Sequence, residues 1–188
     1  MAVSINRVSK TRSNEIVWGC AMTATGAALV ATNRGSICRV DLRTGSQALL
    51  ALRMDWPDAS MVRDDTGVQH ALDFAMSALE RDAHHDVQLT VKGTEFQTRV
   101  WRALQAIPAG ETRTYGELAA AIGQPRAARA VGSAAAANTI ALLIPCHRLV
   151  PAAGGTGAFR WGAALKGRLL LAERDFLPYM GKNEQISA

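Results

Sequence analysis

An apolar run at residues 140–144, ended by Pro145, is the feature that most constrains how this chain folds. Five consecutive apolar residues predict a short buried strand, and Pro145 ends it because proline has no backbone N–H to donate to a neighbouring strand. Cys146 is therefore expected where the chain leaves the core and enters a turn. A thiol in that place can be held rigidly and still reach a pocket.

The residues that follow Cys146 suggest that its thiol is activated. His147 supplies a base and Arg148 a permanent cation. Either can enlarge the thiolate fraction, which is only about 3% at pH 7 for an unperturbed thiol with a pKa near 8.5. The alternative is a cysteine that serves as a small buried hydrophobic residue, which is the commoner role. Cys20 and Cys38 fit that alternative.

The cysteine count and the charge distribution narrow the function classes. Three cysteines without a close pair predict neither a disulfide framework nor a zinc site, and with no signal-like apolar segment they favour a reducing, cytoplasmic setting. No run approaches the roughly 20 apolar residues of a membrane span. Residues 1–90 carry 9 Lys or Arg against 10 Asp or Glu, whereas residues 91–188 carry 12 against 6. The basic half is expected to meet a polyanion.

Short β-type runs dominate the first half of the chain. Residues 15–20, 27–31 and 36–41 are separated by turn residues, which predicts an antiparallel meander. Residues 68–79 carry apolar side chains at helical spacing. Together these pieces predict a small α/β domain over residues 14–90, with residues 1–13 as a flexible tail.

The second half has helical patterns. Thr94 with Gln97, and Thr114 with Glu117, are spaced as capping boxes that begin helices. The second of these helices ends at Gly123, and another is expected over residues 126–137. Two short helices joined by a glycine-containing turn predict a helix-turn-helix. We therefore expect a mainly α domain over residues 91–178, with residues 179–188 as a flexible tail.

The helix expected at 126–137 consists almost entirely of alanine, glycine and serine. Such a helix can approach another surface closely, either inside the protein or in a narrow groove, and the sequence favours neither. A reader of the DNA major groove carries several Arg, Asn or Gln side chains that reach base edges. Here only Arg126, Arg129 and Asn138 are available, so sequence-specific readout is not expected.

Five motifs in the second half, in this order, resemble those of the O6-alkylguanine-DNA alkyltransferases, including the C-terminal half of bacterial Ada. The motifs cover residues 93–97, 114–119, 128–132 with Asn138, 144–148 and 170–173. The resemblance implies a ribonuclease-H-like α/β domain followed by the helical domain. It also implies single-turnover repair, in which an alkyl group leaves O6 of guanine for Cys146, with O4 of thymine as a second candidate substrate.

The resemblance also assigns roles within the reaction. Cys146 is the alkyl acceptor, His147 takes its proton through a water, and Glu173 orients His147, which follows nucleophile–base–orienter logic. Asn138 connects the small-residue helix to the segment before Cys146. The alternatives without a catalytic role are an exposed helical carboxylate for Glu173 and a helix cap for Asn138.

The lesion lies inside the base stack, so the nucleotide must be flipped out. The resemblance implies that Tyr115 crowds the adjacent phosphate and that Arg129 fills the vacated space, where a planar guanidinium stacks well. Their alternatives are a packed aromatic and a solvated cation. The remaining predicted DNA contacts, in a minor groove read largely without sequence preference, are Ala127, Ala130, Ser133 and Arg148.

Phe159 and Leu149 are expected to line the substrate pocket. Many relatives carry tyrosine where this chain has Phe159, and its hydroxyl is thought to contact O6. Losing one donor to developing charge can cost orders of magnitude in rate, so slower transfer is expected here.

Other functions remain possible from these residues. An alkylated-DNA sensor of this family carries tryptophan in place of the acceptor cysteine, which Cys146 contradicts. A regulator of the Ada type uses an additional cysteine-rich zinc domain, and a thiol hydrolase needs an oxyanion hole, and neither has a signature here. His84 and His85 are interpreted as part of a solvated loop. No metal, cofactor or membrane is expected, and the protein is expected to be a monomer.

Overall fold

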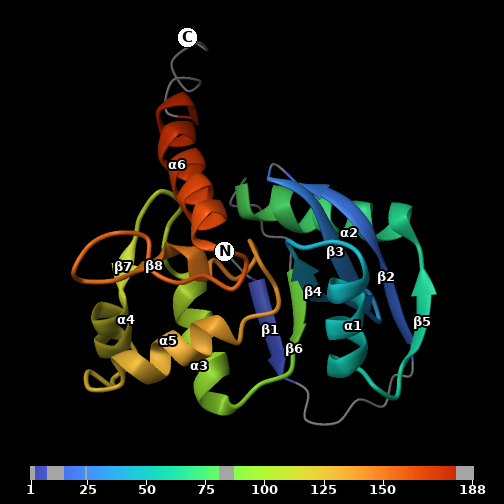
Figure 1. Ribbon diagram of the computed structural model, residues 1–188, viewed down its shortest axis with the longest axis horizontal. Coiled ribbons are helices and arrows are strands. Elements are labelled where there is room, and N and C mark those ends of the chain that lie inside the picture. Colours follow the sequence, from blue (N-terminus) through green and yellow to red (C-terminus); the bar gives the residue numbers. More distant parts are fainter. Residues whose placement is uncertain (1–2, 8–14, 24, 81–86, 181–188) are drawn as a thin grey trace. The chain divides into compact units, whose positions relative to one another are not determined.

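The computed structural model describes residues 3–7, 15–23, 25–80 and 87–180 (Figure 1). The chain forms two compact units. The first contains Met1–Thr98 together with Asn138–Ile144, and the second contains Arg99–Ala137 together with Pro145–Ala188. The segment that leads to Cys146 thus belongs to the first unit, although it lies far along the chain.

The first unit is built on a six-stranded sheet with the order β1-β6-β4-β3-β2-β5. The central strands β2, β3 and β4 form the antiparallel meander predicted from the sequence. The strands are β1 (Val3–Arg7), β2 (Glu15–Thr23), β3 (Gly26–Asn33), β4 (Ser36–Asp41), β5 (Ser60–Arg63) and β6 (Val87–Val91).

The prediction of a small antiparallel sheet with one helix was wrong for the outer strands and for the number of helices. Strands β1, β5 and β6 add parallel pairs at both edges, because two helices carry the chain across the sheet. The prediction of a tail was also wrong for β1, whose Ile5 is buried. A five-residue strand of mixed polarity gives little signal until its partner, β6, is known. Residues 8–14 and 181–188 lie outside the described residues, and residues 179–180 belong to the last helix.

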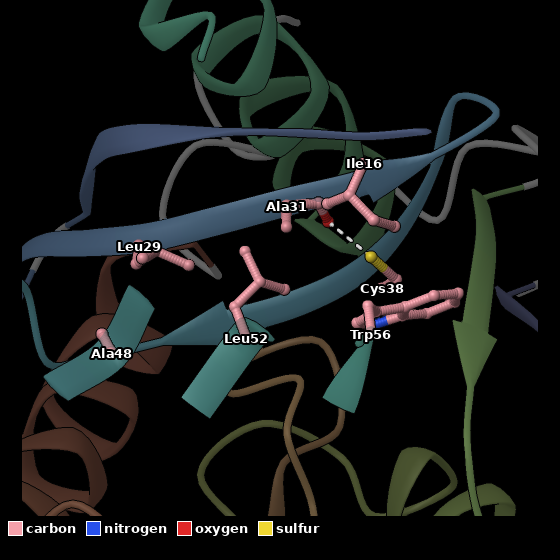
Figure 2. Close-up of a cluster of buried hydrophobic side chains, with 7 residues drawn as sticks. All are labelled: Ile16, Leu29, Ala31, Cys38, Ala48, Leu52 and Trp56. Atoms are coloured by element: carbon pink, nitrogen blue, oxygen red, sulfur yellow. Dashed lines mark hydrogen bonds between the residues drawn. The ribbon is translucent and has the colours of Figure 1, made fainter. Parts of the chain in front are cut away.

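The helices α1 (Ser46–Asp55) and α2 (Asp65–Glu80) pack against opposite faces of the sheet. On one face, Ala48 and Leu52 of α1 pack against apolar side chains of β2, β3 and β4, as Figure 2 shows. On the other face, a Cβ on Gly19 would lie only 2.9 Å from Val68 of α2. The helix predicted at residues 68–79 is α2, and α1 was not predicted.

Residues 140–144 do not form the strand that their composition predicted. Only Ile140 pairs, as an isolated parallel bridge to Val40 of β4, and the chain then turns. Leu142 has a left-handed backbone with φ of 67°. The run is apolar because most of its side chains are buried. Burial alone does not distinguish a buried turn from a strand, which needs a partner along its length.

Helices α3 (Glu95–Gln105) and α4 (Tyr115–Ala121) begin where their sequence signals predicted. Helix α3 begins with the predicted box, in which Gln97 Oε1 accepts from Thr94 N–H at 2.8 Å. Helix α4 begins with the reciprocal Thr114–Glu117 box. Helix α5 (Ala128–Ala136) packs against α4 (Figure 1). Gly123 allows the turn between them because its φ is +74°.

The remaining elements of the second unit begin with the turn that contains Cys146. A single 3₁₀ turn, η1 (Cys146–Arg148), leads into β8 (Leu149–Val150), which pairs in parallel with β7 (Arg113–Thr114). The chain ends its described part in α6 (Ala163–Met180). Among the described helices, none is long and apolar enough to cross a membrane.

Candidate active site

Cys146 begins the 3₁₀ turn η1 directly after Pro145, so the predicted position at the exit from the core is correct. The residue is 6% exposed, and His147 beside it is 2% exposed. The thiol is therefore shielded from bulk water while it remains at the margin of the packed interior. Such burial strengthens the electrostatic interaction between the thiol and any charged group placed near it.

His147 is held by Glu173 of α6, in the contact that the motif resemblance implied. Its Nε2 atom lies 2.8 Å from Glu173 Oε1. With Glu173 ionised, Nε2 carries the proton and donates it to the carboxylate, which leaves Nδ1 as the nitrogen that can accept a proton. The pair thus fixes both the orientation and the tautomer of the imidazole.

Glu173 is also clamped by Arg148 and Gly110. Arg148 Nε and Nη2 donate to the two carboxylate oxygens at 2.9 and 2.8 Å, and Gly110 N–H donates to Oε2 at 3.1 Å. Arg148 Nη1 donates to the carbonyl of Ile107 at 2.5 Å. These contacts lie within the protein, whereas Arg148 was predicted to contact DNA. The sequence showed neither Arg148 nor Gly110 as a partner of Glu173.

These contacts determine the charge state of Glu173. Burial by itself would raise the pKa of this carboxyl, but hydrogen bonds from His147 and Arg148, together with their charges, lower its pKa to about 2. Glu173 is therefore ionised throughout the neutral range. A half-buried carboxylate with donors on both oxygens is a rigid anchor for the imidazole.

Lys166 is a member of the site that the sequence analysis missed. Its side chain is 1% exposed, and its ammonium donates to the carbonyl of Leu149 and, at 3.5 Å, to that of Ala158. Burial lowers the pKa of Lys166, while the charge of Cys146 acts in the opposite direction. The spacing offered a signal, because Lys166 and Glu173 lie seven residues apart and so share one face of α6.

Aromatic side chains form one wall near His147. The ring of Phe159 meets His147 edge-on, with 6.4 Å between ring centroids, and meets Trp161 at 5.1 Å. Leu149, the other predicted pocket residue, has a fully buried side chain. Phe159 is thus close to the predicted base, whereas Leu149 contributes its carbonyl to Lys166.

Tyr115 lies between α5 and the loop that follows β8. The Tyr115 ring lies close to Gly132 of α5, since a Cβ added to that glycine would be 3.6 Å from the ring. The Tyr115 hydroxyl lies close to Gly157, where an added Cβ would also be 3.6 Å away. Burial raises the pKa of Tyr115, and the charge of Cys146 raises it further. Its phenol therefore remains neutral and able to donate a hydrogen bond near Cys146.

The helix α5 presents a face of small residues with one long cation. Arg129, Ala130 and Ser133 are exposed and Ala127 is half-buried, while the opposite face is buried. That buried face is anchored by Trp101, whose Nε1 donates to the carbonyl of Ala134 at 2.9 Å. The predicted DNA contacts on this helix thus lie along one accessible side.

Asn138 belongs to the first unit and holds the chain just before Cys146. Its Nδ2 donates to the carbonyl of Ile144 at 2.9 Å, and its Oδ1 accepts from Ile140 N–H at 2.9 Å. The side chain is 1% exposed. Asn138 therefore stabilises the turn at residues 140–144 by hydrogen bonds to both of its ends. In the sequence it comes shortly after the end of α5.

The other cysteines differ from Cys146. Cys38 is buried, as predicted, and burial raises its pKa to about 12, which keeps it a neutral thiol. Cys20 is exposed, so the interpretation of Cys20 as a buried residue was wrong. Within the described residues, no group of His, Cys, Asp and Glu could hold a metal ion. His84 and His85 lie outside these residues.

Comparison with known proteins identifies relatives of both units. Residues 95–175 match the family profile described as 6-O-methylguanine DNA methyltransferase, DNA binding domain. The chain is 41% identical over 152 residues to the bifunctional transcriptional activator/DNA repair enzyme Ada of Escherichia coli, covering 80% of this chain and 43% of Ada. It is 53% identical over 93 residues to the methylated-DNA–protein-cysteine methyltransferase of Mycolicibacterium paratuberculosis, covering 50% of this chain and 56% of that protein. The matched part spans about half the length of these relatives.

One solved structure matches this chain over most of the length of both proteins. The crystal structure of Mycobacterium tuberculosis OGT in complex with DNA has a TM-score of 0.68 and 33% sequence identity to this chain. The match covers 85% of this chain and 93% of that one. The similarity therefore includes the α/β unit as well as the helical unit.

Proposed function

The chain belongs to the 6-O-methylguanine DNA methyltransferase family, and from this premise we propose that it repairs DNA by moving an alkyl group from O6 of guanine to Cys146. The thiolate attacks the alkyl carbon, a sulfur–carbon bond forms, and the carbon–O6 bond breaks. The electron pair stays on the guanine, which takes up a proton. The thioether has no easy route back, so each protein molecule acts once.

The observation that carries this proposal is the buried Cys146 next to an imidazole fixed by Glu173. The Nδ1 atom of His147 accepts the thiol proton, directly or through a water, and Glu173 stabilises the imidazolium that results. The ammonium of Lys166 stabilises the thiolate by its charge. Arg148 acts as a positioning residue, because it holds Glu173 and not the substrate.

Within this proposal, α4 and α5 act as a helix-turn-helix that places α5 in the minor groove of double-stranded DNA. The small side chains of Ala127, Ala130 and Ser133 let the helix approach the groove closely. Phosphate contacts dominate, so binding weakens with salt and depends little on sequence. Residues 14–90 form a supporting domain in this proposal, and residues 91–178 form the DNA-binding and acceptor domain. The protein acts as a monomer in the cytoplasm.

Replacing Arg129 separates binding from base flipping. Arg129→Ala should lower the saturating transfer rate on duplex DNA by about 10- to 100-fold, because nothing then fills the stack that the flipped guanine leaves. On a single-stranded oligonucleotide with the same lesion, the loss should shrink to a few-fold. Arg126→Ala removes an exposed cation nearby and is the matched control. An equal loss on single and double strands would contradict the assignment.

Phe159→Tyr restores a hydroxyl beside His147. The variant should transfer methyl from O6-methylguanine DNA about 10-fold faster, because an added donor stabilises charge that develops on O6 as the carbon–oxygen bond breaks. Rapid-quench measurement of single-turnover rates checks this. Phe96→Tyr, which adds a hydroxyl on α3, should leave the rate unchanged. A Phe159→Tyr rate equal to that of the natural sequence would contradict the role of this position.

The proposed reaction is tested by following the methyl group. A duplex with one O6-methylguanine is incubated with the protein, and intact-mass analysis followed by peptide mapping locates the methyl group. We expect it on the peptide that contains Cys146, with the lesion converted to guanine. Unmodified protein beside unrepaired DNA would contradict the proposal, and so would binding without repair, as a lesion sensor would give.

A further inference from the structure

Strand β4 provides one edge to the segment that leads to Cys146. Val40 N–H donates to the carbonyl of Thr139 at 3.0 Å, and Ala141 N–H donates to the carbonyl of Val40 at 2.9 Å. Strand β6 pairs with β4 only at Ile37. The edge of β4 is therefore shared, with β6 at one end and residues 138–144 at the other. All of these residues belong to the first unit.

The same segment is pinned from a second side and carries strain. Asn138 holds the carbonyl of Ile144, while Val40 holds Ala141. Between these two fixed points, Leu142 takes its left-handed backbone, which is unfavourable for a residue other than glycine. Such a conformation persists only where the surroundings over-determine it. The turn before Cys146 is thus held in place by its contacts rather than by its own preference.

A buried ion network lies on both sides of Val40. Arg39 is 1% exposed and Asp41 is 0% exposed, and Arg39 Nη2 lies 2.7 Å from Asp41 Oδ2. Arg39 Nη1 pairs with Asp55 at the end of α1, and Asp41 also accepts from Arg43 at 2.9 Å. Apolar residues at such positions are often as stable as a buried ion pair. The charged network adds orientational specificity, because each ion pair requires a particular arrangement of its hydrogen-bonding groups.

We propose that Arg39 is a positioning residue for the transfer reaction, which it supports without touching the substrate. Through Asp41 and Asp55 it fixes β4, so that Val40 holds residues 138–144 in the strained turn and thereby sets the position of Cys146. This inference rests on the proposed alkyl transfer to Cys146.

The variant Arg39→Met removes the charge and keeps a long side chain. Single-turnover transfer should be measured over a range of lesion-DNA concentrations. We expect the saturating rate to fall about 10- to 100-fold, because a small misplacement of the attacking atom is costly. The half-saturating DNA concentration should change less than about twofold, because no DNA contact is altered. Arg39→Lys, which keeps the charge, should recover part of the rate.

Amide hydrogen exchange without DNA gives a readout independent of repair. In Arg39→Met, exchange at Ala141 and Ile144 should quicken by about tenfold, while β2 and β3 keep their protection. Exchange that quickens equally across the sheet would indicate a general loss of stability and would contradict positioning. Arg63→Met, which breaks the exposed Arg63–Asp65 pair of the same unit, is the matched control and should change neither readout.

The outcomes separate the two proposals. If Arg39→Met does not fold, Asp55→Asn weakens the same network from its more exposed end and should give a smaller change in the same direction. Unchanged saturating rate and unchanged exchange in a folded variant would overturn the positioning role. Faster exchange at residues 138–144, combined with a natural protein that transfers no alkyl group, would show that Arg39 fixes this segment but would refute both the proposed function and a role of Arg39 in transfer.

Discussion

Cys146→Ser protein should bind O6-methylguanine DNA as tightly as the natural protein and transfer no measurable methyl group. The substitution changes one atom in a buried side chain, so the fold and the DNA-binding helix are preserved. A hydroxyl is almost never ionised near neutral pH, and its oxygen is a much poorer nucleophile toward an alkyl carbon than a thiolate sulfur. The single-turnover rate should therefore fall by at least about 10³-fold.

Two measurements check this expectation. Fluorescence anisotropy with a labelled lesion duplex gives the affinity, and intact-mass analysis gives the extent of transfer. Cys20→Ser is the matched control, because Cys20 is exposed on β2, and it should keep full activity. Methyl transfer by Cys146→Ser at more than a few per cent of the natural rate would mean that another residue accepts the alkyl group.

Glu173→Gln should be the second most damaging change, with effects on both rate and stability. The amide cannot balance the charge of an imidazolium at His147, and it leaves the half-buried guanidinium of Arg148 without its carboxylate. We expect the saturating rate to fall about 10- to 100-fold and the free energy of unfolding to fall by about 3 kcal/mol. Denaturant unfolding and single-turnover kinetics measure the two effects.

The stability lost in Glu173→Gln should depend on pH, because the pKa of Glu173 is lowered in the natural protein. Because the folded-state pKa of about 2 lies below the ordinary value of 4.5, the stabilisation is complete above about pH 4.5 and is lost as the pH falls toward 2. The difference in stability between natural and Glu173→Gln protein should therefore shrink over that window. Glu117→Gln, an exposed change in a capping box, should show no comparable loss. A pH-independent difference would contradict the ion-pair explanation.

Local signals explain which parts could be predicted from the sequence. The capping boxes at Thr94 and Thr114 depend on residues three apart, and the meander of β2, β3 and β4 depends on adjacent strands and their turns. The turn at Cys146 was predicted because Pro145 cannot continue a strand. In each case the physical cause lies within a few residues of its effect.

Features that depend on distant partners could not be predicted in this way. Strand β1 is defined by β6, some eighty residues later, and the run at residues 140–144 became a turn because β4 offers it only a single bridge, at Val40. Gly110 N–H meets a carboxylate in α6. The motif resemblance supplied Glu173 as the partner of His147, but Lys166 lay outside those motifs and was missed.

The most direct test of single-use alkyl transfer is a titration with lesion DNA in excess over the protein. Repaired guanine should rise to one per protein molecule and then stop, and every modified protein should carry one methyl group, on Cys146. Repair that continues beyond one lesion per protein, or a methyl group that maps to any other residue, would contradict the account.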